Sequence, residues 1–108
     1  MSKPWNLLTP DAIAAVPAQL GVFEIADADH TTLKIGYAGG REPFGLRSAL
    51  NSVLEQAPTD ERFFRVELTH SYLTRWEELL MVHNALHGEL PAENRDHPHR
   101  LGVLAVDE

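Results

Sequence analysis

Hydrophobic and polar positions follow a strand-like pattern in two neighbouring runs, Gly21–Ala26 and Thr31–Tyr37. Both runs are rich in β-branched and aromatic residues, which favour strands. The polar segment Asp27–His30 separates them and contains residues that tolerate a tight turn. The pattern therefore predicts a β-hairpin. A glycine-rich loop, Gly36–Gly45, follows it, and we expect its glycines to supply positive φ angles before the next helix.

The period changes to that of a helix after this loop. Five apolar residues recur at i, i+3, i+4, i+7 and i+8: Leu46, Ala49, Leu50, Val53 and Leu54. They predict an amphipathic helix over about Gly45–Gln56. Arg62–Thr69 then has the composition of a third strand.

The last predicted helix begins at a capping box, because Thr74 and Glu77 have the spacing of an N-cap residue and its N3 partner. This pattern predicts a helix over Arg75–His87, which Gly88 closes. Upstream, Thr9 and the following proline predict a short helix over Pro10–Ala15.

The order of elements is β-β-α-β-α, which predicts a small α+β domain with helices packed on a sheet. We expect a three-stranded, mainly antiparallel sheet with strands near 21–27, 31–37 and 62–69, flanked by helices near 45–56 and 75–87. One domain accounts for residues 1–108, with a core of about 17–94, the N-terminal helix 10–15 and a tail, 95–108. Leu101–Val106 is compatible with a further edge strand.

Composition agrees with one globular domain, since 44% of the 108 residues are hydrophobic and 23% are charged. No apolar run approaches the roughly 20 residues of a membrane span. Met1–Leu8 lacks the apolar core of a secretory signal. The absence of cysteine excludes disulfides, thiolate metal sites and cysteine nucleophiles, and it fits a cytoplasmic protein.

The formal net charge of −7 makes this an acidic protein and argues against nucleic acid as a partner. Nucleic-acid binders usually carry a basic patch, because neutralising phosphates dominates their affinity. The nine basic residues form no run, although a fold could gather Lys34, Arg41 and Arg47 around the glycine-rich loop.

Four segments together resemble the GIY-YIG nuclease domain: Gly21-Val22-Phe23, Lys34-Ile35-Gly36, Leu46–Leu54 and Pro91-Ala92-Glu93-Asn94. They stand at the places of the family's first strand, second strand, arginine helix and P-x-x-N ending. Ten residues separate the first two segments, as is usual in that family. The resemblance covers about Pro17–Asn94 and implies a hairpin, a helix, a third strand and a last helix.

The same resemblance implies that the nuclease reaction is lost. In the family, a glutamate holds a divalent metal, a tyrosine or an activated water starts the attack, and an arginine stabilises the leaving charge. Here Phe23 and Lys34 stand at the two tyrosine positions, Ala49 at the arginine position and Val82 at the glutamate position. Asn94 matches outright, and in the family this asparagine is mainly structural.

We therefore predict a GIY-YIG-like binding or interaction module, without a cofactor, whose cleft takes a protein partner or a small ligand. The expected cleft residues are Phe23, Lys34, Tyr37, Arg41, Arg47, Glu78 and Asn94. The alternative is a divergent Mg²⁺-dependent DNA endonuclease that uses Lys34, Tyr37, Arg47 and Glu78 as catalytic residues in shifted roles. Arg47 is a poor substitute for the family arginine, because it lies about 160° around the helix from the aligned position.

A metal site is a third hypothesis. His83 and His87 have the i, i+4 spacing of two-histidine zinc sites, and Glu78 precedes them on the same helix. Asn84 replaces the glutamate of the H-E-x-x-H pattern, and the sequence identifies no third ligand. Asp96, His97 or His99 could supply one if the tail folds back.

Overall fold

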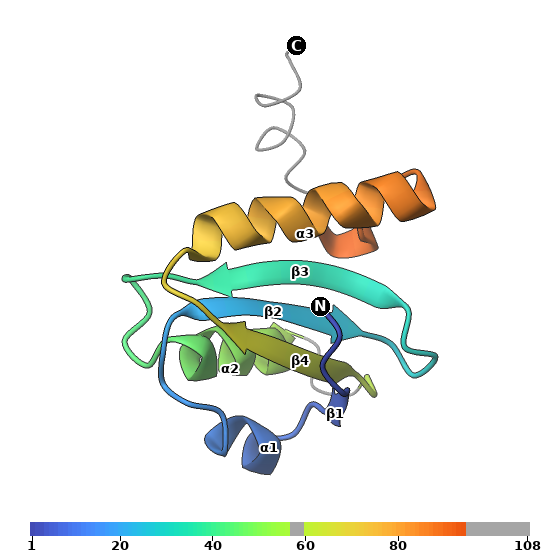
Figure 1. Ribbon diagram of the computed structural model, residues 1–108. Coiled ribbons are helices and arrows are strands. Elements are labelled where there is room, and N and C mark those ends of the chain that lie inside the picture. The colour runs from blue at the N-terminus through green and yellow to red at the C-terminus, as the bar shows by residue number, and fades with distance from the viewer. Residues whose placement is uncertain (57–59, 95–108) are drawn as a thin grey trace.

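The computed structural model describes residues 1–56 and 60–94. Within them, four antiparallel strands form one sheet in the order β1-β4-β2-β3, accompanied by three α-helices (Figure 1). The strands are β1 Asn6–Leu7, β2 Gly21–Ala26, β3 Thr32–Ala38 and β4 Phe63–Leu68. The helices are α1 Pro10–Ala14, α2 Leu46–Gln56, α3 Tyr72–His87 and the 3-10 helix η1 Ala92–Asn94. The predicted α+β class is confirmed.

The predicted count of three strands is wrong, because the N-terminal segment adds a fourth. Asn6 pairs with Phe64 and Leu7 with Phe63, so β1 lies antiparallel to β4 at one edge of the sheet. The Leu8 amide continues this pairing by donating to the Arg62 carbonyl at 2.8 Å. A strand of two residues is too short for hydrophobic alternation to reveal it.

Helix α3 begins one turn earlier than its predicted start at Arg75. Ser71 occupies the N-cap position, and the Arg75 amide already donates to the Ser71 carbonyl at 3.0 Å. Thr74 therefore lies inside the helix, and the predicted capping box is wrong. The added turn carries Tyr72, whose ring contacts overrode the local capping signal. The helix ends as predicted at Gly88, which has a φ of 77°.

Helices cover both faces of the sheet. Alternate residues of β2 point to opposite faces, so they pack against different helices. Phe23 and Ile25 pack with Leu46 and Leu50 of α2, whereas Val22 packs with Leu80 of α3. Figure 1 shows the sheet between α3 on one side and α1 and α2 on the other. All six residues of β2 are buried, as expected for a central strand with helices on both faces. Among the described residues, no helix has the length and apolar character needed to cross a membrane.

The polar turn between β2 and β3 forms where the sequence predicts it. The Asp27 carboxylate accepts hydrogen bonds from the amides of Asp29 at 2.9 Å and Thr31 at 3.0 Å. His30 has a φ of 65°, in the left-handed region that tight turns use. The predicted strand at Leu101–Val106 lies outside the described residues.

Candidate functional site

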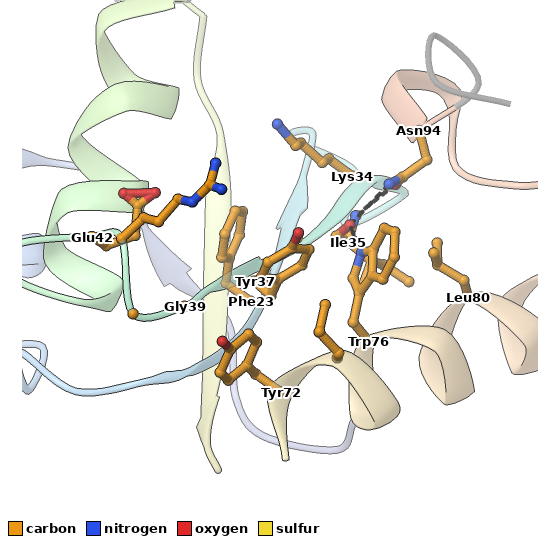
Figure 2. A pocket seen from close by; sticks show the side chains of 14 residues that line it. Phe23, Lys34, Ile35, Tyr37, Gly39, Glu42, Tyr72, Trp76, Leu80 and Asn94 are labelled. Carbon is orange, nitrogen blue, oxygen red and sulfur yellow. Dashed lines mark hydrogen bonds between the residues drawn. The ribbon is translucent and has the colours of Figure 1, made fainter. Parts of the chain in front are cut away.

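A cavity of about 580 Å³ opens along β3, which is an edge strand of the sheet. Its walls are β3, the glycine-rich loop after it and the first half of α3 (Figure 2). The rings of Phe23, Tyr37, Tyr72 and Trp76 gather along the strand. Lys34 and Asn94 lie at one end, and the loop of Gly39–Glu42 lies at the other. We call this cavity the cleft.

Two glycines allow aromatic rings to reach the cleft. Gly36 pairs with Phe23 across the hairpin, and a Cβ at Gly36 would lie 2.4 Å from the Phe23 ring. A Cβ at Gly39 would lie 2.9 Å from the Tyr72 ring. In this loop only Gly45 has a positive φ, of 56°. The expectation that the loop glycines serve positive φ angles therefore holds at Gly45 alone, whereas Gly36 and Gly39 make room for rings.

The aromatic wall of the cleft is held in place by mutual contacts. The rings of Tyr37 and Tyr72 stack with centroids 5.5 Å apart, and Trp76 meets Tyr37 edge to face at 5.2 Å. Each such pair contributes about 0.5–1.5 kcal/mol beyond its buried area. The Trp76 indole N–H also donates to the Ile35 carbonyl at 2.8 Å. The wall is therefore preorganised.

Asn94 binds the outer edge of β3 with both ends of its amide. Its Oδ1 accepts from the Ile35 amide at 2.7 Å, and its Nδ2 donates to the Ile35 carbonyl at 2.9 Å. The backbone N–H of Asn94 donates to the Pro91 carbonyl at 3.0 Å, which fixes the end of η1. Asn94 thus pairs with the edge as a residue of a neighbouring strand would.

The charged residues of the cleft are Lys34, Arg41 and Glu42. The described part of the chain offers no ion pair to Lys34 or Arg41, whereas Arg62, Arg65 and Arg75 are all paired elsewhere. The cleft therefore has two available cations against one carboxylate, inside a chain whose net charge is −7.

Five of the seven residues predicted for the cleft line it: Phe23, Lys34, Tyr37, Arg41 and Asn94. Arg47 and Glu78 do not. The Arg47 guanidinium donates to the Val16 carbonyl, because its position on α2 directs it towards α1. Glu78 is 56% exposed and pairs with Arg75 at 3.2 Å.

An ion-pair network fixes the start of α3 against the sheet. Arg75 binds both carboxylate oxygens of Glu67 on β4, at 2.8 and 3.2 Å, and then reaches Glu78. The hydrogen bonds that Arg75 donates to Glu67 are the main reason that the pKa of Arg75 is raised above its ordinary value. The guanidinium therefore stays charged, and it positions the helix that carries Tyr72 and Trp76.

The sequence analysis missed both Tyr72 and Trp76 as cleft residues. The signal that could have found them is their i, i+4 spacing, which places both rings on one helix face. A helix expected to start at Arg75 left Tyr72 outside this face.

The two histidines of the metal hypothesis do lie side by side, with ring centroids 4.3 Å apart. His83 Nδ1 lies 3.0 Å from the Glu89 carbonyl oxygen, so it acts as a donor there. In residues 1–56 and 60–94, no three His, Cys, Asp or Glu side chains form a group that could hold a metal. Asp96, His97 and His99, the alternative ligands, lie outside the described residues.

The fold and the cleft define a small α+β domain with an aromatic, cation-bearing cleft at the edge of an antiparallel sheet. The chain belongs to the family described as Domain of unknown function (DUF7508), whose sequence model matches residues 1–86. That match spans every cleft residue except Asn94. Comparisons with curated proteins and with solved structures gave no significant match.

Proposed function

We propose that this protein is a GIY-YIG-like domain without nuclease activity, and that it acts as a cytoplasmic binding module. Its cleft takes a protein partner or a small ligand. One observation carries the proposal: the residues at the family's catalytic positions supply no tyrosine, arginine or glutamate, because Phe23 and Lys34 line the cleft there and Ala49 and Val82 do not line it. The succession of the β2–β3 hairpin, α2, β4 and α3 supports the resemblance to that family.

The positions that the resemblance assigns to catalysis bring no suitable group into the cleft. Phe23 and Lys34 line it at the places of the two tyrosines. Ala49, at the arginine position, is buried in the core between the sheet and α2. Val82, at the glutamate position, is 54% exposed on α3. Asn94 is already engaged with the Ile35 backbone.

The geometry also weighs against the divergent endonuclease. That reaction needs Lys34, Tyr37, Arg47 and Glu78 to converge on one phosphate, and only the first two line the cleft. Mg²⁺ is bound through oxygen ligands, carboxylates above all. Glu42 is the single carboxylate that the described lining supplies.

A plasmid-nicking assay with Mg²⁺ and with Mn²⁺ tests this proposal, using the wild type beside Glu78→Ala and Glu42→Ala. We expect no nicking above the buffer control. Cleavage by the wild type that either substitution abolishes would establish the endonuclease instead.

Binding to a fluorescently labelled DNA duplex is the second test, because a DNA-binding surface needs several phosphate contacts. Each contact adds about 0.9 to the log–log salt slope. With two available cations in the cleft and a net charge of −7, we expect no binding near physiological salt. A micromolar or tighter dissociation constant there, with a steep salt slope, would contradict the proposal.

A further inference from the structure

The edge of β3 has a backbone position that is open to pairing. The Asn94 side chain accepts a hydrogen bond from the Ile35 amide and donates one to the Ile35 carbonyl, so these groups point away from β2. Backbone groups along an antiparallel strand alternate between its two sides. Gly36, which pairs with Phe23, therefore turns its groups towards β2, and Tyr37 turns its groups outward, as Ile35 does. In the described part of the chain, the Tyr37 amide and carbonyl have no hydrogen-bond partner.

This open position lies in the wall of the cleft. Edge strands are commonly blocked by charges, bulges, prolines or a covering segment. Asn94 blocks β3 at Ile35, but the next outward position lies beside Gly36 and close to Gly39 and Gly40. A Cβ at Gly40 would meet no atom within 4 Å, so the space next to the loop is open. The backbone edge and the aromatic wall are thus accessible from the same cavity.

We propose that the cleft binds an extended, acidic peptide segment of a partner protein, which adds to β3 as a short strand at Tyr37. This inference rests on the proposed function and names the occupant of the same cleft. In strand addition, main-chain hydrogen bonds supply affinity and pockets for alternate side chains supply specificity. The amide of Asn94 already makes this type of pairing at Ile35, and a peptide would continue it by one outward position.

The side chains of the cleft define the sequence that such a peptide carries. Its inward-facing apolar residue packs against Tyr37, Tyr72 and Trp76, whose rings already form one wall. Its acidic residues pair with Lys34 at one end of the cleft and Arg41 at the other. The chain's net charge of −7 opposes an acidic partner only weakly, because charges beyond about 8 Å are screened at physiological salt.

Selection from a random library of short displayed peptides tests this inference on the intact protein. We expect the selected peptides to alternate apolar with acidic residues and to lack proline at the centre, because proline has no N–H for the Tyr37 carbonyl. The same selection on Lys34→Glu/Arg41→Glu is expected to lose the acidic preference. Equal enrichment of acidic peptides on both proteins would overturn the inference.

Amide hydrogen exchange locates the peptide that the selection yields. On saturation we expect exchange at the Tyr37 amide to slow by about tenfold or more, since it gains a strand partner. A peptide that binds without slowing this amide would overturn strand addition. The proposed function would survive that result, because nicking and DNA binding decide it separately.

Two glycine substitutions in the same loop form a variant and its matched control, and the affinity of each for the selected peptide is measured. Gly39→Ala places a methyl group 2.9 Å from the Tyr72 ring and must displace the wall, whereas Gly40→Ala meets open space. We expect about tenfold weaker binding for the first and less than about twofold change for the second. Equal affinity for both variants would contradict the assigned position of the peptide.

Discussion

Replacing Asn94 by alanine measures how strongly η1 holds the edge of β3. The substitution removes two hydrogen bonds, from the Ile35 amide at 2.7 Å and to the Ile35 carbonyl at 2.9 Å. Ile35 is 1% exposed, so its amide loses its acceptor in a buried setting. An unpaired buried group costs about 1–3 kcal/mol, and a lost neutral hydrogen bond about 0.5–1.5 kcal/mol. We expect the free energy of unfolding to fall by about 2–3 kcal/mol.

Trp76→Phe removes the other donor to the same carbonyl. The Ile35 oxygen keeps its hydrogen bond from Asn94 in this variant, so we expect a smaller loss of about 1 kcal/mol. In the double variant the carbonyl has neither donor and remains buried. The loss of unfolding free energy in the double variant should therefore exceed the sum of the two single losses by about 1 kcal/mol or more, well above the 0.3–0.5 kcal/mol scatter of independent sites.

Urea unfolding followed by circular dichroism gives the free energies of unfolding of the wild type, Asn94→Ala, Trp76→Phe and the double variant, which together form a double-mutant cycle. Glu93→Gln, also on η1, is the matched control. It breaks an ion pair in which the Glu93 side chain is 36% and the Arg62 side chain 14% exposed, and Arg62 keeps its pair with Asp60, so the expected loss is less than about 1 kcal/mol. Additive losses for Asn94→Ala and Trp76→Phe, or equal losses for Asn94→Ala and Glu93→Gln, would refute the reasoning.

Two further substitutions test what supports the sheet. Gly45→Ala should lower the free energy of unfolding by about 2 kcal/mol or more, because φ is 56° and a Cβ would lie 2.3 Å from the Gln19 carbonyl oxygen. Gly40→Ala is the control, and equal melting temperatures for the two variants would contradict this prediction. Arg65→Met should lower the free energy of unfolding by about 3 kcal/mol, since it leaves the carboxylate of Glu24, a residue that is 5% exposed, without its partner at 2.7 Å. Glu24→Met/Arg65→Met should recover most of that loss in urea unfolding, and a double variant no more stable than Arg65→Met would be the contrary result.

The sequence by itself determined the elements whose signals are local. Runs rich in β-branched and aromatic residues located β2, β3 and β4 within one or two residues, and the apolar stripe from Leu46 located α2. The turn at Asp27 and the helix end at Gly88 followed from the conformations that those residues tolerate. Each of these features depends on neighbours only a few residues away, so a single sequence contains the information.

Only the tertiary structure decided which of those residues form the cleft. Asn94 and Ile35 are 59 positions apart, and no local pattern states that they bind each other. The start of α3 at Tyr72 came from a ring stacked on Tyr37 of the edge strand, which outweighed the capping signal at Thr74. Arg47 left the expected cleft because the rotation of α2 is set by the side on which its apolar stripe packs. The direction in which a side chain of α2 or α3 points depends on how the helix packs against the sheet, and this packing brings together residues that are distant in the chain.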